Sequence, residues 1–218
     1  VTMLSTTLTS LIEKELAWRE KELALAKGDV LHAISNRAKF PHAYRAFIVI
    51  TYCHYEGFCK RVIAQAVDDI CKSSIERYRW KPLILERIFS KSARKLVDNC
   101  SNTELVIMLS AKCHLDNLNP LAPESFLATS NLDYKTLVKL LETAGINDSP
   151  YSQYRLELSR LVYLRHDCAH GEILSFDASQ SYKDLADVAF ALQSTAVSVM
   201  HQLAVDLIDG FQAHHFYS

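Results

Sequence analysis

The stretch LSRLVYLRHDCAHGE, at residues 158–172, carries most of the information about the fold. Its leading half is apolar in the manner of a buried helix, and Gly171 suits the position just past a helix C-terminus. Upstream, Pro150 suits the first turn of a helix. The sequence therefore predicts one helix that runs from Pro150 through this stretch to Gly171.

The other segments have helical patterns too, and no internal repeat or convincing strand interrupts them. Helices are expected at residues 6–27 with a stop at Gly28-Asp29, at 41–73, at 82–97, at 102–114, at 133–144 before Gly145, and after the capping box Ser181-x-x-Asp184. Only 5 Gly and 5 Pro occur, which is low for a turn-rich all-β fold. The prediction is an all-α bundle of about six to seven helices.

Length and composition favour a single domain over residues 1–218, with the irregular stretch at 115–131 as a loop inside it. Hydrophobic residues make up 49% of the chain and charged residues 22%, as in an ordinary soluble globular protein. The formal net charge of −1 gives no overall attraction to nucleic acid. An RNA site would therefore have to be local or shared between subunits.

The cysteines and the N-terminal segment indicate a cytoplasmic location. No C-x-x-C pair occurs, so the thiols are expected to be reduced and buried rather than paired in disulfides. No basic leader precedes an apolar stretch, and no run approaches the roughly 18 apolar residues that span a bilayer, so no membrane is expected. The six cysteines are Cys53, Cys59, Cys71, Cys100, Cys113 and Cys168.

His166 and His170 have the i,i+4 spacing of the zinc ligands in H-E-x-x-H helices. Asp167 replaces the Glu that serves as general base there, and it is one methylene shorter. A third ligand would have to be Glu172 or Asp177, which no spacing recommends. Metal hydrolysis is therefore a distant alternative, and we expect no cofactor.

Arg165 and His170 form a second pattern, Arg-x4-His, which suits cleavage of a phosphodiester without metal. Arg offers a fork of permanent donors to phosphate oxygens, and His exchanges protons near neutral pH. Residues five apart on a regular helix lie about 140° apart around its axis, so the two side chains would not converge. Gly171 places His170 in the last turn, where a frayed terminus or a second subunit would solve this difficulty.

The bare spacing is not specific. A chain with 11 Arg and 9 His contains about 0.45 such pairs by chance, and Arg37 and His42 form another one.

The surroundings make the pattern more specific, because LSRLVYL running into RHDCAHGE resembles the R-N-x-x-A-H-G signature of the HEPN superfamily. The match covers Arg165, Ala169, His170 and Gly171, whereas His166 stands where Asn is commoner. Residues 45–62 (RAFIVITYCHYEGFCKRV) resemble the early helix of bacterial members, and residues 130–146 (SNLDYKTLVKLLETAGI) resemble the segment before their motif helix.

This resemblance implies a helical bundle that dimerises so that two motifs face one cleft. Arg165 would stabilise the scissile phosphate and His170 would be the acid/base. His166 would orient the substrate or share the proton transfer, and Asp167 is either an orienting carboxylate or a plain surface residue. Superfamily members commonly cleave RNA to a 2′,3′-cyclic phosphate and a 5′-hydroxyl, and they recur in toxin–antitoxin and phage-defence systems.

Glu56 is the chief candidate outside the motif. It would either reach Arg165 in the cleft, which the resemblance favours, or pair with Lys60 one turn further on. His54 is expected to be a satisfied core or interface histidine, and Cys168 a packed thiol. The charged run at residues 18–27 is interpreted as a solvated helix face. Candidates for RNA contact through charge and stacking are Arg77, Tyr78, Arg79, Trp80 and Lys81.

The sequence thus favours a metal-independent endoribonuclease, expected to be the toxin or effector of a defence module. Its expected partners are RNA, a second copy of the chain, and an antitoxin or other regulatory protein. The alternative is a catalytically inactive HEPN-like module that binds a nucleotide, RNA or protein.

Overall fold

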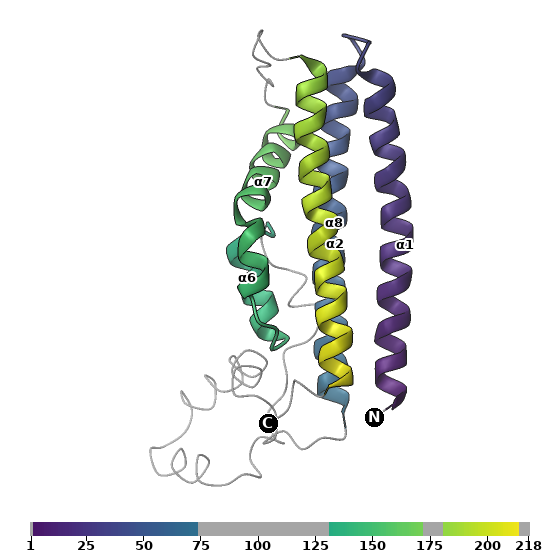
Figure 1. Cartoon of the computed structure of the whole chain (residues 1–218), viewed down its shortest axis with the longest axis vertical. Coiled ribbons are helices and arrows are strands. Elements are labelled where there is room, and N and C mark those ends of the chain that lie inside the picture. Colours follow the sequence, from purple (N-terminus) through teal and green to yellow (C-terminus); the bar gives the residue numbers. More distant parts are fainter. Residues whose placement is uncertain (1, 74–130, 172–180, 214–218) are drawn as a thin grey trace.

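The structure is a computed structural model that describes residues 2–73, 131–171 and 181–213. All regular elements in these ranges are helices, which confirms the all-α prediction (Figure 1). They are α1 (Thr2–Ala33), α2 (Phe40–Lys72), α6 (Tyr134–Thr143), the 3-10 helix η3 (Ser149–Tyr154), α7 (Arg155–Ala169) and α8 (Tyr182–Gln212).

Helix α2 is the centre of the bundle. It packs against α1, α8, α7 and α6, and the long helices α1, α2 and α8 run side by side while α6 and α7 cover the opposite flank of α2 from α1 (Figure 1). Large side chains of α2 are fully buried, among them Phe47, Tyr52, Tyr55 and Phe58. The core therefore forms around α2, and it fixes where α7 lies.

Several predicted helix boundaries agree with the structure and have visible physical causes. Pro41 lies in the first turn of α2, which ends at Lys72. The Asp133 carboxylate accepts a hydrogen bond of 2.7 Å from the Thr136 N–H and so caps α6. At α8, Ser181 and Asp184 form the predicted capping box.

Two boundaries were predicted wrongly. Helix α1 does not stop at Gly28 but continues to Ala33, because Val30 and Ala33 extend its buried stripe. That burial outweighs the cost of a helical glycine, about 1 kcal/mol. Upstream of the motif, Pro150 lies in the first turn of the 3-10 helix η3, which begins at Ser149, and the α-helix starts only at Arg155.

Some predictions fall outside the described residues. They are the helices at 82–97 and 102–114, nearly all of the loop at 115–131, and the basic-aromatic cluster at 77–81.

Among the described helices, α8 is long and apolar enough to suit a membrane span by composition. Its buried face, which includes Val199, Leu203 and Leu207, packs within the bundle. The core helix of a bundle meets the same compositional test, so this feature alone does not indicate a membrane.

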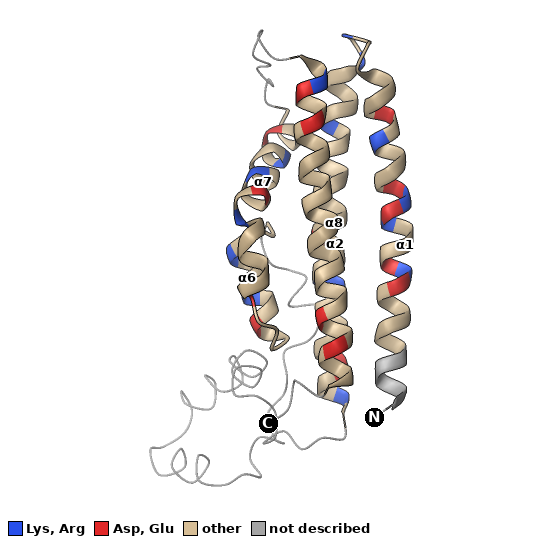
Figure 2. Ribbon diagram, viewed as in Figure 1, with Lys and Arg blue, Asp and Glu red and all other residues tan. Residues whose placement is uncertain are grey.

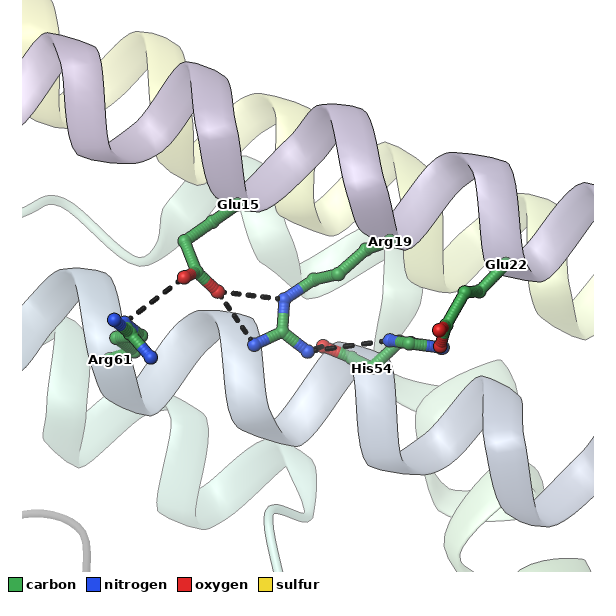
Figure 3. Close-up of polar contacts among 5 residues, drawn as sticks. All are labelled: Glu15, Arg19, Glu22, His54 and Arg61. Atoms are coloured by element: carbon green, nitrogen blue, oxygen red, sulfur yellow. Dashed lines mark hydrogen bonds and ion pairs between the residues drawn. The ribbon is translucent and has the colours of Figure 1, made fainter.

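Helices α1 and α2 are joined by a polar cluster of Glu15, Arg19, Glu22, His54 and Arg61 (Figure 3). Glu15, Arg19 and His54 are buried, whereas Glu22 and Arg61 are exposed. The Arg19 guanidinium donates two hydrogen bonds to the Glu15 carboxylate, at 2.8 and 3.2 Å, and a third to the carbonyl oxygen of His54 at 3.3 Å. Arg61 approaches the other Glu15 oxygen at 3.1 Å from the solvent side. The cluster thus satisfies charged groups that would otherwise be buried alone.

The charged run at residues 18–27 was expected to be a solvated helix face. This prediction is wrong in part, because the run contains a buried arginine. Figure 2 shows charged residues gathered midway along α1, but Arg19 among them is only 6% exposed. Trp18 remains 42% exposed and lies over the Arg19 guanidinium at 4.4 Å.

His54 is a satisfied core histidine, as predicted. Its Nε2 lies 3.1 Å from a Glu22 carboxylate oxygen and its Nδ1 lies 3.4 Å from Nη1 of Arg19. A neutral ring that carries its proton on Nε2 can donate to Glu22 and accept from Arg19. Burial, followed by the Arg19 charge, lowers the pKa of His54, which favours this neutral form.

Gly57 provides the space for Arg19, because a Cβ there would lie 3.1 Å from Nη1 of the guanidinium. Gly28 is a matched control, since a Cβ on it meets nothing within 4 Å. We expect Gly28→Ala to raise the free energy of unfolding by about 0.5–1 kcal/mol through helix propensity. Gly57→Ala should raise the free energy of unfolding by less, or lower it, because the added methyl group crowds Arg19. Thermal unfolding measures both, and an equal gain in the two variants would contradict this account.

Candidate active site at the end of α7

Gly171 ends the motif helix as predicted. Its φ of 73° lies in the left-handed region that favours glycine, directly after the last helical residue and its C-cap. His170 is that C-cap, and its N–H donates to the His166 carbonyl oxygen at 3.0 Å. The His170 imidazole is therefore presented at the exposed end of α7.

Arg165 is held in place by two residues from other segments. Its guanidinium carbon lies 4.8 Å from the centre of the Tyr52 ring on α2, and its Nη1 donates to the Asn131 side-chain oxygen at 3.2 Å. Arg165 remains partly exposed. A partly exposed arginine placed over an aromatic face is well suited to binding an anion.

Tyr52 is a rigid support for Arg165. Its side chain is fully buried, and its hydroxyl accepts a hydrogen bond of 2.7 Å from the Leu132 N–H. Burial raises the pKa of Tyr52 far above its ordinary value, and the Glu56 charge adds to this effect. The ring therefore stays neutral throughout the usual pH range.

The sequence reasoning missed both Tyr52 and Asn131. Each lies within a stretch that resembles the HEPN superfamily, residues 45–62 and 130–146, and the aromatic-rich face of the first was noted. The contact with Arg165 depends on how α2 and α7 pack, and the spacing of residues within one helix does not predict the packing between two helices.

Glu56 does not contact Arg165 directly, so the favoured expectation for this side chain was wrong. Its carboxylate pairs with Nζ of Lys60 at 2.9 Å, which was the alternative. The charge of Glu56 also acts on Tyr52, whose pKa it raises further after burial.

His166 and His170 lie together at the end of α7. Their ring centres are 4.3 Å apart, and the Asp167 carboxylate approaches Nδ1 of His166 at 3.8 Å. Within residues 2–73, 131–171 and 181–213, no three His, Cys, Asp or Glu side chains are grouped to hold a metal ion. The two third ligands considered for zinc, Glu172 and Asp177, lie outside these ranges.

One chain does not bring Arg165 and His170 into contact. Arg165 lies on Tyr52 and Asn131, whereas the ring of His170 lies against His166. The helix is regular up to Ala169, so the two side chains keep the divergence expected from five-residue spacing. The described part of the chain contains no hydrogen bond between them.

Cys168 is a packed thiol, as predicted. It is 8% exposed, and burial raises its pKa, which makes it a poor nucleophile. Of the other described cysteines, all free, Cys59 is buried and Cys71 intermediate. Cys53 is exposed, contrary to the expectation that the thiols are buried.

Comparison with known proteins identifies one family. The family model described as RiboL-PSP-HEPN matches residues 14–200, which include α2, α6, α7 and most of α8. No curated protein matches the chain. No solved structure matches it either.

Proposed function

This chain belongs to the RiboL-PSP-HEPN family and carries a HEPN domain of the nuclease or RNA-binding type, and from this premise we propose that it is a metal-independent endoribonuclease. The observation that carries the proposal is the arrangement at the end of α7. Arg165 is fixed on the Tyr52 ring and Asn131, and the His170 imidazole is exposed one turn further on.

The proposed reaction is attack of an RNA 2′-hydroxyl on the adjacent phosphate. His170 accepts the proton of the attacking hydroxyl or donates one to the departing 5′-oxygen. Arg165 stabilises the negative charge that develops on the phosphate oxygens. The O2′–P bond forms as the P–O5′ bond breaks, which leaves a 2′,3′-cyclic phosphate and a 5′-hydroxyl.

Two copies of the chain form the site in this proposal. Because Arg165 and His170 diverge on one α7, an arginine from one protomer would act with a histidine from the other across a two-fold axis. Pairing two motifs would also concentrate positive charge, as is required in a chain whose net charge is −1. His166 and Asp167 would then border the shared cleft and orient the imidazoles.

The biological setting that we propose is a toxin–antitoxin or phage-defence module in the cytoplasm, with a partner that restrains the nuclease. The support for this setting is that members of the superfamily recur in such systems. An antitoxin would be expected to cover the exposed end of α7.

The test is cleavage of labelled RNA by the purified protein in excess EDTA. The ribonuclease is supported if cleavage persists and yields ends with a 2′,3′-cyclic phosphate and a 5′-hydroxyl. Loss of activity in EDTA would point instead to metal at His166 and His170. A protein that binds RNA without cleaving it would be the inactive module. The presence of His166 where the signature commonly has Asn favours that alternative.

A further inference from the structure

Two adjoining hollows, which share lining residues, form a groove along the surface of α6 and α7 near Arg165. Its first part, about 340 Å³, is lined by Asn131, Asp133, Ser159, Val162, Tyr163 and His166. Two of these residues belong to the candidate site or touch it, because Asn131 bonds to Arg165 and His166 is in the motif. The groove therefore begins beside the candidate site, next to Arg165 and His170, which do not line it.

The second part of the groove is larger, about 580 Å³, and shares Asp133 and Ser159 with the first. Beyond them it is lined by Lys135 and Lys139 from α6 and by Arg155 from the start of α7. The two lysines are one helical turn apart, a rise of about 6 Å. Side chains at this spacing can follow successive phosphates of an extended strand.

The cations of this second part are more exposed than its carboxylates. Lys135, Lys139 and Arg155 are exposed, whereas its carboxylates, on Asp133, Glu142 and Asp148, are in residues of intermediate exposure. The Asp133 carboxylate is in addition occupied in capping α6. Figure 2 shows several Lys and Arg residues along α7 and α6, with Asp and Glu residues among them. An anionic strand entering the groove would meet these cations first.

Tyr163 supplies an exposed aromatic ring close to the motif. It is 67% exposed, unlike the buried tyrosines of α2, and it lines the part of the groove that contains His166. Bases of single-stranded RNA stack on such rings at about 1–3 kcal/mol per base, with little regard to sequence.

We propose that this groove binds the single-stranded RNA that flanks the scissile phosphate. Tyr163 stacks a base next to the cleavage point, and Lys135, Lys139 and Arg155 hold phosphates further along the strand. The inference rests on the proposed function, because it takes the motif end of the groove as the place of cleavage. It assigns a strand-binding role to residues that lie outside the Arg-x4-His motif.

The test compares three proteins that all carry His170→Ala, so that the RNA stays intact. One has no further change, one adds Lys135→Gln, Lys139→Gln and Arg155→Gln, and the control adds Lys14→Gln, Lys21→Gln and Arg37→Gln at exposed positions elsewhere. Fluorescence anisotropy of a labelled single-stranded RNA is measured over a range of salt. Thermal unfolding verifies that all three proteins are folded.

We expect the groove variant to bind at least about tenfold more weakly and to reduce the slope of log K against log salt by about 2. The control should bind like the parent. Tyr163→Ala should weaken binding about tenfold and Tyr163→Phe much less, because the ring is what stacks. Equal dissociation constants for groove and control variants would overturn the inference.

The two proposals fail in different ways. If the wild-type protein cleaves RNA and the groove variant binds like the control, the groove is wrong and the ribonuclease stands. If the wild-type protein does not cleave but the groove variant loses RNA binding, strand binding in the groove stands and the ribonuclease is wrong.

Discussion

Arg165→Ala and His170→Ala are each expected to reduce RNA cleavage by about 10²–10⁴-fold. Removing His170 removes proton transfer, and removing Arg165 removes the stabilisation of charge on the phosphate. The loss of either effect reduces the rate by factors of this size in other enzymes. Neither side chain is buried, so both variants should unfold at the wild-type temperature. Initial rates on a labelled RNA measure the effect.

The matched control is the second Arg-x4-His pair of the chain, Arg37 and His42. Both residues are exposed, and neither lies on α7. Arg37→Ala and His42→Ala should cleave at the wild-type rate. If cleavage survives Arg165→Ala or His170→Ala at more than about a tenth of the wild-type rate, these residues do not have the roles proposed here.

Mixing the two inactive variants tests whether the site is shared. In a heterodimer of Arg165→Ala and His170→Ala, one composite site has lost both residues and the other retains both. After random exchange of subunits, about a quarter of the wild-type activity should return. A mixture that stays inactive would contradict a site built from one arginine and one histidine of opposite protomers.

Arg19→Ala is expected to have the largest effect on stability, a loss of about 3 kcal/mol in the free energy of unfolding. It leaves the Glu15 carboxylate, with a side chain only 7% exposed, without its two strongest donors. In a chain of this size the melting temperature should fall by roughly 6–12 °C. Differential scanning calorimetry or circular dichroism measures this fall.

Arg61→Ala is the matched control, because Arg61 pairs with the same carboxylate from a side chain that is 60% exposed. An exposed partner contributes less than about 1 kcal/mol. If the two variants lose equal stability, the buried guanidinium is not what joins α1 to α2.

Features encoded locally could be predicted from the sequence. The end of α7 depends on Gly171 and its positive φ, and the start of α8 depends on Ser181 and Asp184 three residues later. Each requires only neighbours in sequence, so the pattern was sufficient. The helical periodicity that gave the all-α class is local in the same sense.

Features that depend on packing between helices could not be predicted. Arg19 looked solvated because its neighbours are charged, and its burial requires both Glu15 and the space above Gly57. Glu56 had two suitable partners, and only the packed structure chooses Lys60. Gly28 favours the end of a helix, but the burial of Val30 stabilises the continuation of α1 past it.

The aromatic support under Arg165 also supplies a criterion for recognising this kind of site. Arg37 and His42 satisfy the same spacing, yet they lie at exposed positions in the turn before α2 and in its first turn. What distinguishes Arg165 is a tyrosine face from α2 and an amide from the segment before α6. A chain that keeps the motif but has lost the equivalents of Tyr52 and Asn131 would hold its arginine loosely. We expect a relative of that kind to be inactive.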